Sequence, residues 1–117
     1  KRTVNIKALA HVTGGGIPGN IVRVLGKFGA ELDNLWAPLD AMLKLQEFGK
    51  VTDREAYEVW NMGIGMILVS NEFEKIKKSL AKHGIKAKVI GRVTKEKGVR
   101  ITSQGFQAKG EVLGYEE

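Results

Sequence analysis

The sequence predicts an α/β protein with a two-layer plan, in which a small mixed, largely antiparallel sheet carries helices on at least one face. Three observations support this prediction. Strand-like alternation and helix-like periodicity follow one another along the chain. A strand-like run leads into consecutive glycines at 14–16, and an amphipathic helical pattern follows. With 117 residues the chain has room for a single domain, residues 1–117, with one modest core.

The pattern predicts strands that alternate with helices. The strands are expected at about 5–13, 30–34, 61–70, 86–94, 98–103 and 110–114, and the helices at about 20–28, 38–49, 52–59 and 72–83. The strand at 5–13 alternates loosely and ends at the glycines. The strand at 61–70 is apolar and is entered through two glycines at alternate positions. The sequence Lys95-Glu96-Lys97-Gly98 predicts a hairpin between the strands on either side of it.

Each predicted helix carries local start or stop signals. They are Gly19 or Asn20 as N-cap and Gly26 and Gly29 as stops for 20–28, Pro38 at the start and Phe48-Gly49 at the end of 38–49, the capping-box pair Thr52 and Glu55 for 52–59, and Gly84 after 72–83. Residues 104–117 are dotted with glycine and weakly patterned, so this tail stays unassigned apart from its one expected strand.

Composition excludes several classes of site. The hydrophobic fraction of 43% and the charged fraction of 27% are ordinary for a globular domain. No apolar run approaches the roughly 20 residues that span a bilayer. The chain has no cysteine and only two histidines, His11 and His83, so we expect no disulfide and no metal site within it. The lack of cysteine and of a secretory signal pattern is typical of a cytoplasmic protein.

The net charge of +6 raises nucleic acid as a partner, but the lysines are not arranged for it. Four of them share the predicted helix at 72–83 with two glutamates, and no aromatic residues are interleaved for base stacking. We therefore expect a solvated charged face and no nucleic-acid partner.

The glycines at 14–16 are the strongest functional signal. Glycine permits positive φ and lets a ligand approach the backbone closely. A helix start presents unpaired N–H groups at the positive end of the helix dipole. Together they favour an anion, usually a phosphate. A tight turn without a ligand is the structural alternative.

Two nucleotide motifs were weighed for this stretch. Gly14 to Gly19 matches G-x-G-x-x-G, and Asp33 follows at the distance of a ribose-binding acid. However, the chain is short for a dinucleotide domain, and Pro18 lies where a donor amide is wanted. A Walker-type loop is excluded for two reasons: the spacing from Gly19 to Gly26-Lys27 is wrong, and no Ser or Thr follows Lys27. A phosphate-binding turn of another family remains.

The motifs resemble those of the AIR synthetase (phosphoribosylformylglycinamidine cyclo-ligase) family. His11-x-Thr13-Gly14-Gly15-Gly16, with Asn20 and Arg23, is similar to the family segment H-x-T-G-G-G-x-x-x-N-x-x-R. Glu55-x-Tyr57, followed by Asn61-Met62-Gly63-Ile64-Gly65-Met66, is similar to E-M-Y-x-x-x-N-M-G-x-G-M. The resemblance spans about 3–103 and covers only the family's C-terminal domain.

The resemblance implies one wall of an interdomain site. In the family, ATP and magnesium serve to phosphorylate an amide oxygen of formylglycinamidine ribonucleotide, after which ring closure gives aminoimidazole ribonucleotide. The residues implied are Thr13, Gly14, Gly15 and Gly16 as phosphate holders, Asn20 and Arg23 as orienting groups, His11 as a substrate contact or proton carrier, and Asn61, Gly63 and Gly65 as cleft-shaping residues. His11, Arg23 and the two alternate glycines have equally plausible structural roles.

The resemblance also implies partners. An N-terminal domain, or a separately encoded half, would carry the acidic magnesium ligands and most ATP contacts, and the assembly would be a homodimer. This chain alone would then be inactive. Pro18-Gly19 and Gly26 depart from the family pattern. These departures leave open a relative such as a selenophosphate synthetase, a thiamine-phosphate kinase or a hydrogenase-maturation protein, and also a stand-alone, non-catalytic phosphate- or nucleotide-binding module.

Overall fold

The structure is a computed structural model that describes residues 6–115. The strands and helices follow one another in the predicted order. They are β1 (Ala8–His11), α1 (Gly16–Leu25), β2 (Gly29–Leu32), α2 (Asp40–Gly49), α3 (Asp53–Val59), β3 (Met66–Val69), α4 (Phe73–Ala81), β4 (Arg92–Thr94), β5 (Gly98–Thr102) and β6 (Val112–Tyr115). The strands expected at 61–70 and 86–94 are thus much shorter than predicted. Residue 5, the expected start of the first strand, lies outside the described residues.

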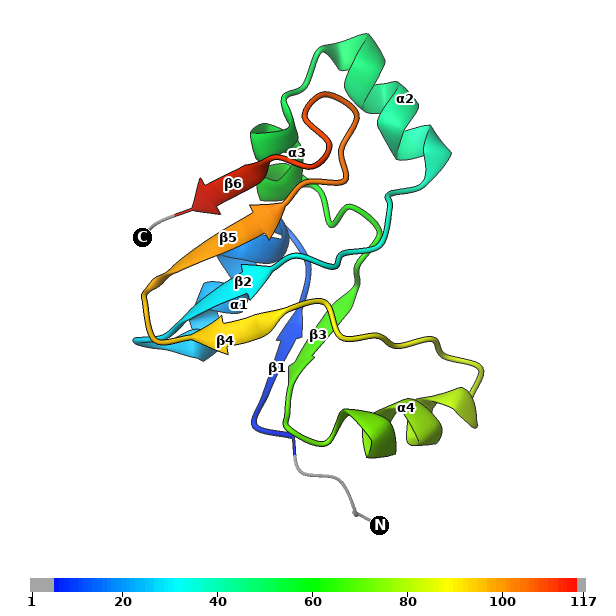
Figure 1. The fold of residues 1–117 in the computed structure, drawn as a ribbon. Coiled ribbons are helices and arrows are strands. Elements are labelled where there is room, and N and C mark those ends of the chain that lie inside the picture. Colours follow the sequence, from blue (N-terminus) through cyan, green and yellow to red (C-terminus); the bar gives the residue numbers. More distant parts are fainter. Residues whose placement is uncertain (1–5, 116–117) are drawn as a thin grey trace.

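The strands form two sheets rather than one (Figure 1). β1 and β3 pair antiparallel as a two-stranded ribbon, and the second sheet has the order β4-β2-β5-β6. In that sheet only the β2–β5 pair is parallel. The predicted fold class, a two-layer α/β protein with mixed, largely antiparallel strands, is confirmed.

The predicted hairpin between β4 and β5 is wrong, because β2 lies between these strands. Their connection passes over the start of β2 at Gly29, where a Cβ atom would lie 1.9 Å from the carbonyl oxygen of Glu96 and 2.4 Å from that of Gly98. Glycine is therefore required at that crossing. Burial favours the parallel pairing, since core side chains of β2 and β5 lie opposite each other: Ala30 with Val99 and Leu32 with Ile101.

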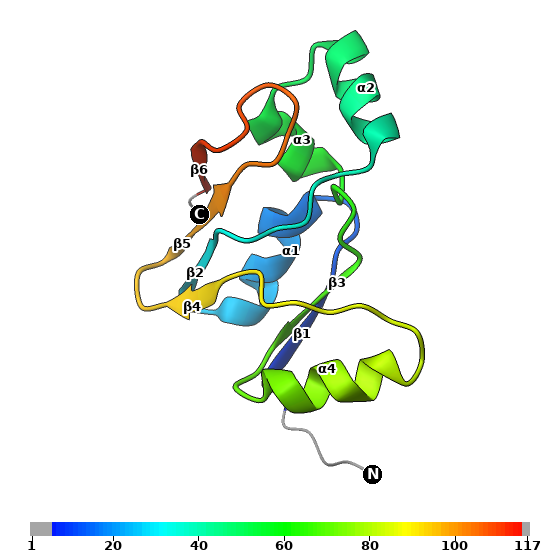
Figure 2. The ribbon, with the colours of Figure 1, turned by 45° about the vertical axis from the view of Figure 1, so that its right-hand side comes forward.

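Helix α1 begins before the predicted start at residue 20. Its N-cap is Gly15, and Gly26 follows its last residue, as predicted. Pro18 falls in the first turn, where backbone N–H groups have no partner within the helix, so its ring costs no hydrogen bond there. Figure 2 shows α1 between the four-stranded sheet and the β1–β3 ribbon. Its buried apolar residues lie at helical spacing and face α3 and β1: Ile17, Ile21 and Leu25.

The other helices differ in how deeply they are packed. α2 and α4 lie at opposite ends of the molecule (Figure 1), and each buries a single residue, Gln46 and Ile76 respectively. α3 starts at the predicted cap, because the Thr52 hydroxyl accepts a hydrogen bond from the Glu55 amide at 3.2 Å. No helix among residues 6–115 is long and apolar enough to cross a membrane.

A buried carboxylate at the start of α3 holds the loop between β5 and β6. Asp53 is 1% exposed and accepts hydrogen bonds from the Ser103 hydroxyl at 2.6 Å and the Gln46 amide at 2.5 Å. The backbone amides of Gln107 and Ala108 also donate to it, at 3.0 and 2.7 Å. We call these five residues the Asp53 hub. Because its donors come from α2 and from the loop that follows β5, the hub joins segments that are distant in the sequence.

The Asp53 hub and its neighbours hold residues 104–108 in a defined conformation, in the tail for which the sequence predicted little structure. The side-chain oxygen Oε1 of Gln46 accepts from the Phe106 amide at 3.0 Å, and the Tyr57 hydroxyl accepts from the Gln104 amide at 3.0 Å. The chain then returns as β6, close to the strand expected at 110–114. Residues 104–115 are therefore an integral part of the fold.

Hydrogen bonding also sets the protonation of the hub. Burial alone would raise the pKa of Asp53, but the bonds from Ser103, Gln46 and the two backbone amides outweigh burial and lower the pKa below its ordinary 3.8. A carboxyl group whose pKa is lowered by folding stabilises the fold fully above its unfolded pKa. That stabilisation is lost as the pH falls through the folded pKa. The hub therefore contributes at neutral pH and weakens below about 3.8.

We predict that Asp53→Asn lowers the free energy of unfolding at pH 7 by about 3 kcal/mol, because an amide replaces one acceptor oxygen and faces backbone donors. Urea unfolding measures this change. The difference from the unmodified chain should shrink at pH 3, where the carboxylate itself begins to lose its contribution.

The matched control is Asp33→Asn at an exposed site, which should change the unfolding free energy by less than about 0.5 kcal/mol. An Asp53→Asn variant as stable as the unmodified chain at pH 7 would contradict the role of the hub.

Candidate functional site

The three glycines form the turn between β1 and α1, where the sequence predicted it. Gly15 has φ 96° and Gly16 has φ 63°, which are left-handed values that favour glycine. A Cβ atom on Gly16 would lie 1.8 Å from the carbonyl oxygen of Tyr57 and 2.9 Å from that of Trp60. The turn therefore lies directly against the end of α3, and no larger residue fits at position 16.

The side chain of Asn20 fixes the shape of this turn through hydrogen bonds to its carbonyl groups. Its side chain is buried, and its Nδ2 group donates to the carbonyl oxygens of Thr13, Gly14 and Gly16 at 3.3, 3.2 and 2.7 Å. The Thr13 hydroxyl donates to Asn20 Oδ1 at 3.4 Å. Asn20 thus acts on the shape of the turn, a structural role that differs from the expected direct contact with a phosphate.

The exposed side of the turn offers backbone donors. Within residues 6–115, the Gly16 amide donates to Thr13 O at 3.0 Å, whereas the exposed amides of Gly14 and Gly15 donate to no protein group. The first turn of α1 carries no acidic side chain. Two free N–H groups at the positive end of a ten-residue helix fit a phosphate group.

The predicted cleft-shaping residues lie beside the glycine turn. The Val12 amide donates to Gly65 O at 2.9 Å, which ties the segment 61–65 to the end of β1. This segment is a turn rather than the predicted strand: Asn61 Oδ1 accepts from the Gly63 amide at 2.9 Å, and Met62 and Gly63 have φ values of 52° and 89°. A buried methionine with positive φ is strained, and such strain often accompanies function.

The structure places the two remaining predicted residues differently. His11 is exposed at the end of β1, opposite Met66, three residues before Gly14. Arg23 is exposed in the last turn of α1, about 10 Å along the helix axis from Gly16. His11 therefore lies near the turn along the chain, whereas Arg23 lies away from it.

A cavity of about 520 Å³ is lined in part by the segment 63–66, and sequence reasoning missed it. We call it the α4 groove. Apolar residues of α4 and β3 form two of its sides, and residues 85–91 form a third. The inward spacing of apolar residues in α4 was recognisable in the sequence, but the space beside them depends on where residues 85–91 run.

No magnesium site is visible within residues 6–115, where no three acidic or histidine side chains lie close enough to hold a metal ion. We therefore derive no chemical step through a metal from these residues.

We predict that Gly16→Ala lowers the free energy of unfolding by at least about 2 kcal/mol, because its Cβ atom collides with the backbone of α3 and its φ is left-handed. Thermal or urea unfolding measures this. Gly14→Ala is the matched control: no atom lies within 4 Å of its Cβ position, so stability should change by less than about 0.5 kcal/mol. Equal stability of the two variants would contradict the packing described above.

Comparison with known proteins agrees with the resemblance seen in the motifs. A family model described as "AIR synthase related protein, C-terminal domain" matches residues 1–104. The chain is 42% identical over 106 residues to a phosphoribosylformylglycinamidine cyclo-ligase of Thermodesulfovibrio yellowstonii, which covers 87% of this chain and 31% of that protein.

Relatives of the same name occur in distant organisms. The Bacillus subtilis protein is 42% identical over 98 residues, covering 80% of this chain and 28% of its own length. The Methanopyrus kandleri protein is 32% identical over 110 residues, covering 92% of this chain and 31% of its own length. The chain thus spans about a third of the length of the curated relatives it matches. Since the family match includes both motifs and most of the fold, the chain belongs to the AIR synthase related family and corresponds to its C-terminal domain.

Proposed function

We propose that this chain is the C-terminal domain of a phosphoribosylformylglycinamidine cyclo-ligase and forms one wall of its active site. The reaction would be the ATP-dependent ring closure of formylglycinamidine ribonucleotide to aminoimidazole ribonucleotide. The observation that carries the proposal is the glycine turn at the start of α1, whose motif resembles that of the family and whose exposed residues Gly14 and Gly15 have amides that donate to no protein group within residues 6–115.

The residues of the site would divide the work between binding and shaping. The amides of Gly14 and Gly15 would hold a phosphate of the substrate or of ATP. Asn20 would keep the turn in shape through the three carbonyl groups that it bonds. His11, exposed beside the turn, would contact the substrate or carry a proton.

The rest of the catalytic machinery would lie outside this chain. Magnesium ligands and most ATP contacts would come from an N-terminal domain or a separately encoded half, and the assembly would be a cytoplasmic homodimer. The chain alone would then have no cyclo-ligase activity. Arg23 lies away from the turn, so it would contact only a part of the substrate that is distant from the phosphate held there.

A chimera tests this proposal. The chain would replace the matching C-terminal third of the Thermodesulfovibrio yellowstonii enzyme, and ATP-dependent formation of aminoimidazole ribonucleotide would be measured. We expect turnover by the chimera and none by the isolated chain. Gly14→Leu, which adds a side chain where a ligand must approach, should lower kcat/KM at least about tenfold. Gly114→Leu, at an equally open glycine in β6, should leave it within about twofold.

A folded chimera without turnover, beside an active parent enzyme, would exclude the cyclo-ligase role. The alternative, a stand-alone phosphate- or nucleotide-binding module, would then be favoured if the isolated chain still bound phosphate through the glycine turn.

A further inference from the structure

The α4 groove combines apolar walls with positive charge. Its apolar lining comes from Trp36, from β3 and the residues just before it, from α4 and from the segment 85–91. The charged residues among its lining are Lys86 and Lys88, and no acidic residue lines it. A volume of about 520 Å³ lies within the range of sites that enclose small organic molecules.

Two aromatic rings, Trp36 and Phe73, line the groove, and each has a lysine ammonium group near it. Trp36 is 38% exposed and lines the groove, and the Lys88 ammonium group lies 5.2 Å from the centre of its ring. Another lysine, Lys77 of α4, lies 5.8 Å from the centre of the ring of Phe73, which also lines the groove. Aromatic faces favour a flat apolar body, and the ammonium groups favour a negative charge on the same molecule.

Hydrogen bonds fix the walls of the groove in place. Asn34 donates from its side chain to Val89 O at 2.7 Å and from its backbone to Ile90 O at 3.0 Å. At the end of α4, the Ile85 amide donates to Leu80 O at 3.0 Å. The segment 85–91 is thus tied at both ends, so a ligand would meet a largely preformed site, which limits the entropy lost on binding.

We propose that the α4 groove binds an aromatic organic anion, with the flat ring against Trp36 and the apolar walls and the anionic group near Lys86 and Lys88. The groove does not include residues 14–16 of the glycine turn, although it shares Gly63 and Gly65 with the segment beside that turn. The proposal does not depend on the cyclo-ligase activity. Both a nucleotide and a non-nucleotide aromatic acid carry a flat ring and a negative charge, and the choice of probe distinguishes the two.

The test is an NMR titration of the chain that follows the indole N–H signals of Trp36 and Trp60, assigned with Trp36→Phe. The probes are AMP with adenosine as its neutral partner, and 1-naphthalenesulfonate with 1-naphthalenemethanol as its neutral partner. We expect at least one anion to shift the Trp36 signal saturably at millimolar concentration and to bind at least fivefold more tightly than its neutral partner. Trp60, outside the groove lining, should stay unshifted. Saturation by AMP indicates a nucleotide, and saturation by the sulfonate alone indicates a non-nucleotide acid.

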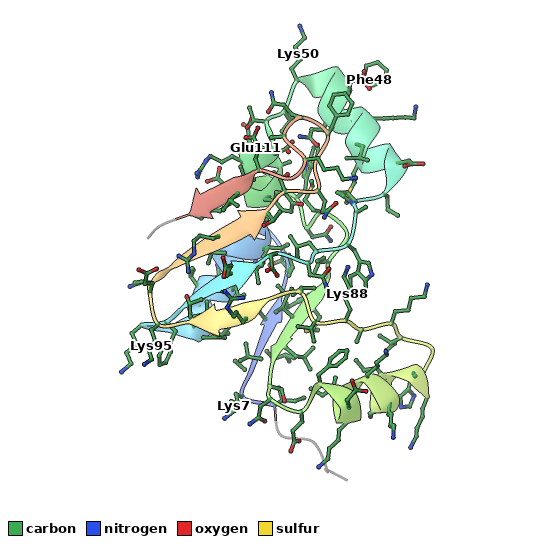
Figure 3. The ribbon with its side chains drawn as sticks, in the orientation of Figure 1. Lys7, Phe48, Lys50, Lys88, Lys95 and Glu111 are labelled. Atoms are coloured by element: carbon green, nitrogen blue, oxygen red, sulfur yellow. The ribbon has the colours of Figure 1, made fainter. Side chains whose placement is uncertain are left out.

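Two double variants with the same change in net charge distinguish a direct contact between the anion and the groove lysines from attraction of the anion to the overall positive charge of the chain. Lys86→Ala with Lys88→Ala should weaken anion binding at least fivefold and leave the neutral partner unchanged. Lys95→Ala with Lys97→Ala, in the exposed turn before β5, should change anion binding by less than twofold. Figure 3 shows Lys88 and Lys95 beyond opposite ends of β4.

Three results would overturn the proposal. The first is that neither anion moves the Trp36 signal. The second is that the neutral partners bind as tightly as the anions, or that the two double variants lose affinity equally. The third is that the Trp36 signal shifts with protein concentration alone, which would identify a second copy of the chain as the occupant.

Discussion

The contact between Gly16 and the carbonyl groups of Tyr57 and Trp60 is the constraint on which the functional end of the molecule depends. A Cβ atom at 1.8 Å from a backbone oxygen cannot exist, so the start of α1 can lie against α3 only because residue 16 is glycine. This contact fixes the last residue of the glycine turn against the end of α3. The geometry of the turn is therefore a property of packing between two helices, and the loop sequence alone does not determine it.

The position of α3 is in turn fixed at its first residues. Thr52 caps the helix, and Asp53 accepts hydrogen bonds from α2 and from the loop between β5 and β6. A carboxylate buried among neutral donors is stable only when its oxygens are satisfied. The glycine turn is thus supported through α3 by the segment that follows β5.

The sequence predicted local structure well and long-range pairing poorly. The order of the elements, the cap at Thr52 and the turn at 14–16 follow from signals within a few residues, and all three are confirmed. The hairpin at 95–98 failed because the pairing of β2 with β5 is decided by burial of side chains far apart in the chain. The start of α1 was misplaced because Pro18 was treated as part of the turn, although a first helical turn accepts it.

In the candidate site, too, the features that depend on local sequence were predicted, and those that depend on long-range packing were not. The motifs brought His11, the glycines and residues 61–65 to one place, which follows from the pairing of β1 with β3 and the bond from Val12 to Gly65. Asn20 was expected to face a ligand, but its burial turns it toward the loop carbonyls. No local pattern could reveal the α4 groove or the Asp53 hub, because each is assembled from segments that meet only in the folded chain.

We propose that the glycine turn binds an anion, and a titration of the isotope-labelled chain with inorganic phosphate, followed by NMR, is the decisive test. We expect saturable shifts of the Gly14 and Gly15 amide signals, with little change in the Gly16 amide, which already donates to Thr13. Shifts confined to the lysines of α4, or no saturable shift at the turn, would contradict it.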